Sequence, residues 1–529
     1  MVDSSFGAPA RVSPPAPLFA DDAIAGAAGA GPERVVIIGA GMAGLATALA
    51  LKDSASEVLI VERDAPPDIF SPDVAFDVWK RSGVPQLHHT HIFLARLRTI
   101  LRDRHPEVLA ELLSEGIEPS TIDQALPAGQ WESAAAPGDD DLLHLWGRRA
   151  TLEYVLRRHV GKQKNVTFVH SARVEGLVVD EKGSGLRVSG IEIRRHGELE
   201  VVPADVVVDA SGARSKAADW LRNRGATIDE QLERSPCAYY CRHFRQRDMT
   251  TEPPRRGTGA NVDYLIFGTF FAEKGTFSIA FAVPDTEPEL SESLRHPEGF
   301  DYVCGRIPAL ARWTARADPT SRVLGGAGLS NRWNHYATRG KKTVLGFFPV
   351  GDSHVQTNPI YGRGCSSAFV QADVLADVLA ASRDPVERMR RFHRGVRTLL
   401  MPHFRFSVQA DRAFLARARG LRGERLTFFD GVASYLYEHA FGPAIEESPF
   451  VAREWIKVQQ LSPVSPPWVG FLVALRTLFL LLVRRVRGVR REAPKFAPPR
   501  DELVKGLPAA PTRGAPRHEM VTEQAADPL

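Results

Sequence analysis

The sequence has few cysteines, no excess of one charge and no long apolar run at its start. Only four of its 529 residues are cysteine, and only Cys237 and Cys241 lie close together. A CxxxC pair without further Cys or His at ligand spacing predicts neither a zinc site nor a disulfide framework, so we expect reduced thiols in a cytoplasmic protein. The 67 Lys and Arg nearly balance the 63 Asp and Glu. This balance argues against a nucleic-acid-binding protein.

Residues 1–32 contain no basic stretch that leads into a sustained apolar core, and they consist mostly of Ala, Gly, Pro and Ser. We therefore predict a disordered leader here rather than a signal peptide. A chain of 529 residues is longer than one hydrophobic core usually serves. This length predicts two or more substructures, and the apolar content of 44% is typical of a globular enzyme.

Residues 34–64 have the pattern of a strand, a glycine turn, a helix and a second strand. The first apolar run ends at Gly39, and Gly41 and Gly44 complete a GxGxxG spacing before an alanine-rich helical segment. The second apolar run ends at Glu62, at the distance where a ribose-binding carboxylate is expected. The unit is therefore predicted to be a complete βαβ motif that binds a dinucleotide.

Each residue of this motif has a role that dinucleotide binding requires. Gly39 permits the tight turn, Gly41 lets the backbone approach the pyrophosphate, and Gly44 lets the helix pack closely on the strand. The helix N-terminus offers N–H groups to the phosphates. Glu62 can accept protons from both ribose hydroxyls and would repel a 2′-phosphate, which disfavours NADP and leaves FAD and NAD open.

Three histidines, His88, His89 and His91, follow one another closely after Arg81 and Gln86. His88 and His91 could share one helix face and bind a metal. No further ligand stands at a recognised spacing, so we predict no metal site. The remaining interpretation is that these histidines begin a helix or serve a polar role beside a cofactor.

Two later segments repeat the pattern of a buried strand that ends in small residues. One is residues 206–212, which end in Asp209 and Gly212; the other is residues 344–364, which contain Gly351, Asp352, Gly362 and Gly364 before an alanine-rich helix. A second strand–turn–helix crossover would explain the latter. The functional interpretation is that Asp352 accepts hydrogen bonds from a polyol while N–H groups near Gly364 face developing negative charge.

These separated motifs together resemble the FAD-dependent monooxygenase superfamily, which has the fold of para-hydroxybenzoate hydroxylase and squalene epoxidase. The resemblance rests on the glycine fingerprint with Glu62, the basic helix of residues 149–157, the strand that ends in Asp209-Ala210-Ser211-Gly212, and the loop from Gly351 to Gly364. It covers residues 33–390. The stretches 83–86 and 358–362 look most like those of bacterial tailoring oxygenases in secondary metabolism, including polyether epoxidases.

The resemblance implies an α/β fold with a glutathione-reductase-like, Rossmann-type FAD-binding domain, a β-rich substrate domain and a helical C-terminal region. The implied ranges are a leader of residues 1–32, an FAD-binding domain of residues 33–226 and 330–395, a substrate domain of residues 227–329, a helical region of residues 396–491 and a disordered tail of residues 492–529.

The resemblance also implies the contacts of a non-covalently bound FAD. Glu62 would hold the adenosine ribose, Arg149 would lie along the phosphates and ribityl chain, and Asp352 would bind the ribityl group. The full predicted cofactor site is Gly39, Gly41, Gly44, Glu62, Arg63, Arg81, Arg149, Val174, Asp209, Gly212, Gly351, Asp352, Gly362 and Gly364. Gln86, His89, His91 and Pro359 are predicted to lie at the reacting end of the flavin.

The implied reaction is reduction of FAD by NAD(P)H, capture of O₂ as a flavin C4a-hydroperoxide, and hydroxylation or epoxidation of a lipophilic substrate. Many hydroxylases of the family carry an Asp-Gly motif where this chain has Asp209-Ala210-Ser211-Gly212, so a separate flavin reductase is an alternative electron donor. A geranylgeranyl-reductase-like enzyme that acts on a C=C bond, and a flavoprotein that serves as a binding or assembly subunit, are alternative functions. The Trp-x-Trp-x-Ile-Pro signature of flavin halogenases is absent.

Residues 468–483 are almost entirely apolar apart from Arg476, and five arginines follow at positions 484, 485, 487, 490 and 491. Sixteen residues are short for a membrane span, which needs about twenty. The flanking arginines and Trp468 suit an interfacial helix on anionic lipid. The alternative is a buried helix that docks on the flavin domain or in a dimer interface. We therefore expect a cytoplasmic protein with peripheral membrane contact through residues 468–491 as one option.

Overall fold

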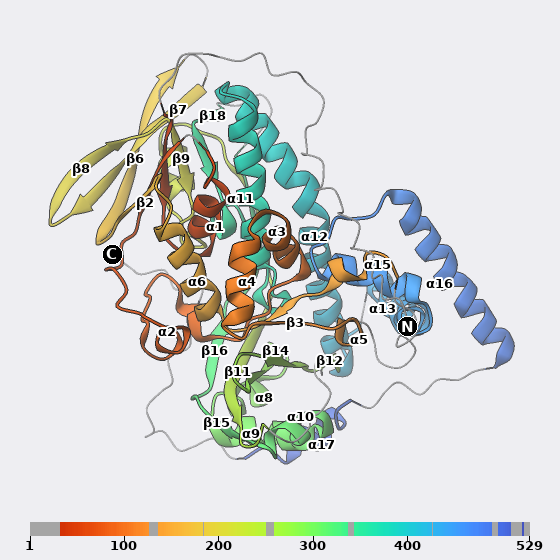
Figure 1. Ribbon diagram of the computed structural model, residues 1–529. Coiled ribbons are helices and arrows are strands. Elements are labelled where there is room, and N and C mark those ends of the chain that lie inside the picture. The colour runs from red at the N-terminus through yellow and green to blue at the C-terminus, as the bar shows by residue number, and fades with distance from the viewer. Residues whose placement is uncertain are drawn as a thin grey trace, which may run out of the picture.

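The computed structural model of the chain describes residues 32–54, 56–125, 136–182, 185–249, 259–336, 343–425, 427–488, 496–508 and 521–522. The described part is a mixed α/β structure (Figure 1), as the sequence predicts. The predicted disordered leader falls almost entirely on residues 1–31, which lie outside the described residues.

A five-stranded parallel sheet with the strand order β19-β9-β1-β2-β5 lies at the centre of the predicted FAD-binding domain. Its three central strands, β9, β1 and β2, are buried on both faces, which explains why they are nearly continuous runs of Val, Ile and Leu rather than alternating patterns. Its strands are β1 (Arg34–Ile38), β2 (Glu57–Val61), β5 (Val166–Val169), β9 (Val206–Asp209) and β19 (Phe347–Pro349).

The two faces of the parallel sheet pack against different layers. Val35 and Ile37 contact the helices on one face, whereas Val36 and Ile38 pack on a second, four-stranded sheet. The helices are α1 (Met42–Ala50), α3 (Ala95–Arg104), α4 (Pro106–Ser114), α6 (Arg149–Gly161) and α11 (Gly364–Ala381). The second sheet contains β6 (Ala172–Lys182), β7 (Gly185–Arg195), β8 (Glu198–Pro203) and β18 (Val344–Leu345).

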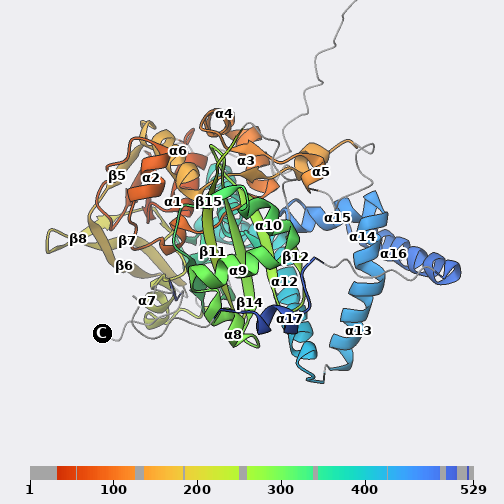
Figure 2. The same cartoon turned by 90° about the horizontal axis from the view of Figure 1, so that it is seen from below.

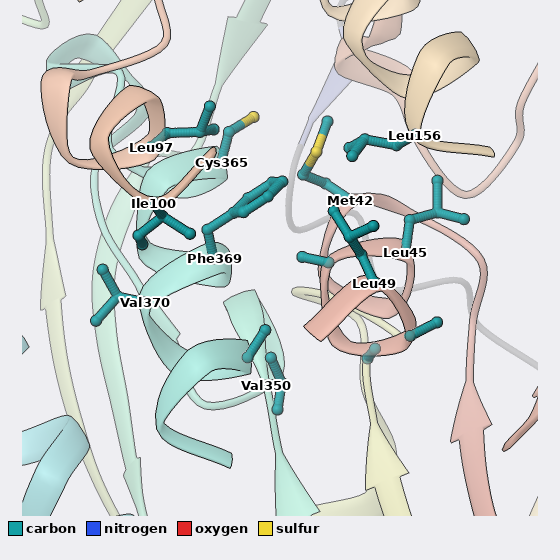
Figure 3. Close-up of a cluster of buried hydrophobic side chains, with 14 of the residues drawn as sticks. Met42, Leu45, Leu49, Leu97, Ile100, Leu156, Val350, Cys365, Phe369 and Val370 are labelled. Carbon is teal, nitrogen blue, oxygen red and sulfur yellow. The ribbon is translucent and has the colours of Figure 1, made fainter. Parts of the chain in front are cut away.

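The helical layer joins segments that are far apart in the sequence. Met42, Leu45 and Leu49 of α1 face Phe369 of α11 (Figure 3), and all four side chains are buried. Leu97 and Ile100 of α3 complete this core from the other side of α11. The glycine turn before α1 and the glycine turn before α11 are thereby brought to the same end of the sheet.

Residues 237–327 form most of an antiparallel sheet that is covered on one side by short helices. Its aromatic core includes Phe277, Phe281, Phe300 and Trp313. The strands are β11 (Cys237–Gln246), β12 (Gly259–Asn261), β13 (Ile266–Phe271), β14 (Thr276–Pro284), β15 (Ala317–Pro319), β16 (Leu324–Ala327) and β21 (Val521–Thr522). The helices are α8 (Pro288–Ser293), α9 (Pro297–Arg306) and α10 (Pro308–Thr314).

The strands at the two ends of the predicted β-rich segment do not belong to the antiparallel sheet. Strand β10 (Asp229–Arg234) pairs with β17 (Ser330–His335), which pairs in turn with β20 (Val355–Gln356). These strands form a separate small sheet, so the predicted domain boundaries at residues 227 and 329 cut through a pairing that joins the two parts. Short pieces complete the fold: β3 (Glu118–Pro119), β4 (Leu145–Trp146), α2 (Pro72–Val78), α5 (Ile122–Ala125) and α7 (Ala217–Asn223).

Residues 496–508 correct the prediction of a disordered tail from residue 492 onward. They contain helix α17 (Arg500–Lys505), which lies against the helices of the antiparallel sheet in both views (Figures 1 and 2). Leu503 is fully buried in the aromatic core, and Arg500 Nε donates to the buried Glu287 carboxylate at 2.7 Å. The disorder was predicted from the proline content of the segment. In the structure, the burial of Leu503 and the ion pair of Arg500 with Glu287 hold the segment on the protein.

The C-terminal region is helical, as predicted. Helix α12 (Pro385–Leu421) runs without interruption across the boundary that we predicted between residues 395 and 396. Further helices are α13 (Phe428–Leu436), α14 (Gly442–Glu447), α15 (Pro449–Gln459) and α16 (Pro467–Arg487), with a π-helical turn, Tyr437–Phe441. Helix α16 lies at the right edge of the molecule in Figure 1, away from the parallel sheet. Arg490 and Arg491 of the predicted arginine cluster lie outside the described residues.

Helix α16 is longer than the apolar run that predicts it, because Arg484, Arg485 and Arg487 continue the same helix. By length and composition alone, α11 meets the criteria for a membrane-crossing helix among the described residues, but 72% of it is buried inside the protein.

Candidate active site

One cavity of about 760 Å³ opens between the carboxyl ends of the parallel strands and the antiparallel sheet. Ligands in open α/β sheets bind at this end of the strands. Every predicted site residue except Gly44 lines this cavity: Gly39, Gly41, Glu62, Arg63, Arg81, Gln86, His89, His91, Arg149, Val174, Asp209, Gly212, Gly351, Asp352, Pro359, Gly362 and Gly364.

The glycines of the fingerprint serve two purposes: Gly41 faces the cavity, whereas Gly44 allows close packing behind it. A Cβ on Gly41 would meet nothing within 4 Å, because it would project into the cavity. A Cβ on Gly44 would lie 1.9 Å from the Gly39 carbonyl oxygen, so Gly44 supports the close contact of α1 with the turn without touching the cavity. No side chain caps the N-terminus of α1. Its first N–H groups are therefore available to a phosphate, which fits the predicted pyrophosphate position.

Glu62 lies at the end of β2 and is already held by three donors. Its Oε2 accepts from Ala40 N at 2.9 Å and from Arg81 Nη2 at 2.8 Å, and its Oε1 accepts from Asp64 N at 3.1 Å. Burial works to raise the pKa of Glu62, but the Arg81 charge and these backbone N–H groups outweigh it and lower the pKa. A carboxylate has about four lone-pair sites, so Glu62 keeps capacity for one further donor. The expectation that it accepts both ribose hydroxyls requires displacement of one present partner.

Arg81 is the centre of a buried ion-pair cluster. Besides Glu62, it contacts Glu153 of α6, and its guanidinium lies 5.1 Å from the centre of the Trp79 ring. Burial lowers the pKa of Arg81 to about 10, so it stays charged at neutral pH. Arg149, at the first position of α6, contacts one carboxylate among the described residues, Glu153 at 3.4 Å, and it lines the cavity where an anion could bind.

The end of β9 forms the neighbouring wall. Asp209 is fully buried, and it accepts from the Ser211 and Ser215 hydroxyls, each at 2.5 Å. Burial raises the pKa of Asp209 despite these hydrogen bonds. Gly212 has a φ of +83°, a conformation that favours glycine and turns the chain along the cavity. Asp209 therefore orders this turn, and the backbone of the turn faces the cavity.

The second glycine-rich loop comes from β19 and α11. Gly351 has a φ of +77°, and a Cβ there would lie 2.7 Å from the Ala43 side chain of α1, so this loop and α1 meet closely. Asp352 follows it at the cavity wall, where burial raises its pKa against the opposing charges of Arg149 and Arg332. Helix α11 has no side-chain cap at its N-terminus, beside Gly364. This arrangement presents one carboxylate and free N–H groups to a polar ligand.

His89 and His91 lie where the polar part of the cavity meets the antiparallel sheet. His89 Nδ1 and the Tyr239 hydroxyl are 2.5 Å apart, and His91 Nδ1 lies 2.8 Å from the His89 carbonyl oxygen. Burial lowers the pKa of both histidines to about 3, with additional repulsion from His243 at His89 and from Arg149 at His91. Both imidazoles are therefore neutral at physiological pH. The third histidine, His88, contacts the Trp79 carbonyl oxygen at 3.1 Å.

The far half of the cavity is apolar. The antiparallel sheet contributes Tyr239, Ile266, Phe267, Gly268, Phe270, Ala280, Phe281 and Ala282. None of these side chains is charged, whereas all the Asp, Glu, Arg and Lys residues that line the cavity come from residues 62–216 and from Asp352. The cavity thus combines a polar half that suits a dinucleotide with an apolar half that suits a lipophilic small molecule.

Sequence reasoning missed several residues of the site. Tyr239 lies on β11, far from the glycine motifs in sequence, and no local signal marks it. Thr357 lines the cavity, and its buried hydroxyl has no hydrogen-bond partner among the described residues. Asp411 of α12 supports the loop that carries Pro359: it accepts from Asn358 Nδ2 at 2.9 Å and from the Tyr361 hydroxyl at 2.7 Å.

The described residues contain no group of three or more His, Cys, Asp or Glu side chains placed to bind a metal ion. The four cysteines are buried free thiols.

Residues 34–68 match the family model of an FAD binding domain. The chain is 27% identical over 378 residues to the protein Rv3254 of Mycobacterium tuberculosis, a match that covers 66% of this chain and 73% of that protein.

Two solved structures share the fold at low sequence identity. The flavin-dependent brominase Bmp2 is 15% identical, with a TM-score of 0.57, over 86% of this chain and 99% of that chain. The p-nitrophenol 4-monooxygenase PnpA from Pseudomonas putida DLL-E4 is also 15% identical, with a TM-score of 0.54, over 82% of this chain and 99% of that chain. The chain therefore shares the fold of these two flavin-dependent enzymes, and its first βαβ unit matches the model of an FAD binding domain.

Proposed function

We propose that the chain is an FAD-dependent monooxygenase that hydroxylates or epoxidises a lipophilic small molecule. The observation that carries this proposal is the single cavity in which a charged, dinucleotide-type half meets an uncharged half built by the antiparallel sheet. A flavin held by the first half would present its ring to a substrate in the second. Bound and reduced FAD supplies the chemistry that activates O₂ and provides the transferred oxygen atom.

The chain's own residues have roles in binding and positioning. The free N–H groups of α1 and the guanidinium of Arg149 suit the pyrophosphate, Glu62 suits a ribose hydroxyl, and Asp352 suits the polyol chain. Burial raises the pKa of Asp352, so a hydroxyl donor that stabilises the carboxylate would bind favourably there. Arg81 holds Glu62 in place through its direct ion pair.

At the substrate side, Tyr239 and His89 form the polar contact beside an otherwise apolar wall. Because the pKa of His89 is about 3, this histidine acts as a neutral hydrogen-bond partner and not as a proton donor at neutral pH. The pair would orient one polar group of the substrate. Ile266, Phe267 and Phe281 would exclude water from the reacting atoms.

The overall reaction balances as substrate, O₂, NAD(P)H and one proton giving oxygenated substrate, NAD(P)⁺ and water. The electrons come from NAD(P)H directly or through a separate flavin reductase. Anaerobic reduction of the purified protein by NADH or NADPH, with and without an added flavin reductase, identifies the donor.

The first test is flavin binding. Purified protein should be yellow, and acid should release FAD. Asp352→Ala should lose the flavin, because a charge-assisted hydrogen bond to the polyol contributes roughly 1.5–3 kcal/mol. Full flavin occupancy in this variant would show that Asp352 does not bind the polyol chain.

The second test is turnover with isotopically labelled O₂ and a panel of apolar alkenes and aromatic compounds. One labelled oxygen atom in the product, with equal consumption of NAD(P)H, supports a monooxygenase. Saturation of a C=C bond without O₂ uptake would replace this proposal with a reductase. A covalently bound bromine or chlorine atom in the product, when bromide or chloride is added to the assay, would replace it with a halogenase. Tyr239→Phe should retain FAD and raise the KM for any substrate that bears a hydrogen-bonding group.

A further inference from the structure

Helix α16 carries a row of large apolar side chains on its outward face. These residues recur at three- and four-residue spacing and are between 42% and 88% exposed: Trp468, Phe471, Leu472, Leu475, Leu478, Phe479, Leu482 and Val486. The helix contains 21 residues, so at 1.5 Å per residue the row extends over about 30 Å. Exposed apolar patches of this extent mark interaction sites on otherwise soluble folds.

The opposite face of α16 holds the helix on the protein. Val469 is buried, and Val473 and Leu480 pack on the small core formed by Ala444, Ile445 and neighbouring residues of α14 and α15. Arg484 Nε donates to Glu447 at 2.9 Å on this side. The inward contacts fix the orientation of the helix, so its exposed apolar row points away from the protein. The helix itself lies at the right edge of the molecule in Figures 1 and 2.

The charge on α16 is of one sign. Its sequence contains Arg476, Arg484, Arg485 and Arg487 and no acidic residue. Among the described residues, only Arg484 forms an ion pair with a carboxylate. Arg485 donates to the Tyr435 hydroxyl at 3.0 Å, and the Arg476 guanidinium lies 5.5 Å from the centre of the Phe479 ring. Arg476 and Arg485 therefore remain charged donors beside the apolar row.

A groove borders the same row. Phe450 and Arg453 of α15 face Leu472 and Arg476 of α16 across an open space of about 660 Å³. Phe450 is itself 39% exposed. The groove thus offers apolar walls with a guanidinium on each side, although Arg453 is already paired with Asp139.

We propose that the outward face of α16 docks on a bilayer that contains anionic phospholipid. The apolar row would enter the boundary between headgroups and acyl chains, and Arg476, Arg485 and Arg487 would contact lipid phosphates. The groove beside Arg476 is placed to receive a headgroup. This inference rests on the surface of α16 and not on the proposed reaction, so either can fail while the other stands.

The positive charge of α16 favours a bilayer over a second copy of the chain as the partner of this face. In a two-fold symmetric dimer through this face, α16 would pack on its own copy, where only arginines stand as charged groups. The arginines would then face apolar side chains or one another, which is unfavourable. Anionic lipid supplies the opposite charge along the whole helix.

The test is sedimentation of the full-length protein with vesicles of phosphatidylcholine alone, and with vesicles of equal parts phosphatidylcholine and phosphatidylglycerol. We expect binding to the mixed vesicles, weaker binding to pure phosphatidylcholine, and a decrease as salt rises. The triple variant Phe471→Glu, Leu475→Glu, Leu478→Glu should bind at least ~tenfold more weakly to the mixed vesicles.

The matched control is Leu199→Glu with Val201→Glu, which changes two exposed apolar residues of β8 that are 54% and 61% exposed. This variant should bind as the unchanged chain does. Circular dichroism and flavin content must stay unchanged in both variants, since every substituted residue is exposed. The proposal would be overturned if the triple variant bound the mixed vesicles as well as the unchanged chain does. It would also be overturned if the unchanged chain bound no vesicles and instead formed a dimer in analytical ultracentrifugation that only the triple variant abolished.

Discussion

Asp411 connects the C-terminal helical region to the loop that carries Pro359, and its removal is the most informative single perturbation. The side chain is 5% exposed on α12. Its Oδ1 accepts from Asn358 and Tyr361, and its Oδ2 accepts from Asn331 Nδ2 at 2.7 Å. Burial raises the pKa of Asp411, although these hydrogen bonds oppose the shift.

The expected cost of Asp411→Ala follows from counting the donors that lose their acceptor. Asn358 Nδ2 keeps the Ser235 hydroxyl at 2.9 Å, whereas Asn331 Nδ2 and the Tyr361 hydroxyl have no second acceptor in the described part of the chain. Each buried donor left without a partner costs about 1–3 kcal/mol, so the free energy of unfolding should fall by roughly 2–6 kcal/mol. Asp411→Asn keeps one oxygen and turns one acceptor into a donor, so it should lose about half as much.

The assay is urea unfolding followed by tryptophan fluorescence, together with flavin content after gel filtration. Arg412→Ala is the control on the same helix, because its side chain is 65% exposed and its ion pair with Glu233 should contribute at most about 1 kcal/mol. If Asp411→Ala unfolds within about 0.5 kcal/mol of the unchanged chain, the hydrogen-bond network does not support the loop as we describe.

Three further predictions concern single positions. Gly41→Ala should keep its free energy of unfolding within about 0.5 kcal/mol of the unchanged chain yet lose FAD, because its Cβ enters only the cavity. Gly44→Ala should lower the free energy of unfolding by about 1–3 kcal/mol or more, because its Cβ clashes with the turn. Urea unfolding and flavin absorbance separate the two variants, and equal behaviour would contradict the different roles of these glycines. Burial, opposed by the charge of Arg104, raises the pKa of Asp373 from 3.8 to about 6. The folded state therefore keeps this proton while the unfolded state releases it, so the free energy of unfolding should fall by up to about 3 kcal/mol as pH rises from about 4 to about 6. Asp373→Asn should remove this dependence on pH. An unchanged pH profile in the variant would refute the prediction. Leu503→Ala should cost about 2–5 kcal/mol in urea unfolding because Leu503 is fully buried, and a cost near zero would restore the prediction that this tail is disordered.

The local sequence was sufficient to predict the first βαβ unit and most of the predicted residues that line the cavity. The glycine spacing, the acid after the second strand and the small-residue turns after later strands are short-range signals, because a phosphate or a polyol needs free backbone N–H groups and carboxylates at strand ends. Parallel strands then bring their carboxyl ends to one edge of the sheet. Residues as distant as Gly39, Asp209 and Asp352 therefore line one cavity.

Only the tertiary structure decided which long-range partners complete the site and which surfaces stay exposed. Tyr239 reaches His89, and Asp411 reaches the loop at Asn358, across more than fifty residues of sequence, and single polar residues in strands or helices carry no signal of such pairing. Leu503 is buried, although the proline content of its segment predicted disorder. The apolar row on α16 is exposed, whereas its apolar composition was compatible with either an exposed or a buried helix. Burial depends on what the rest of the chain packs against a segment, and composition does not contain that information.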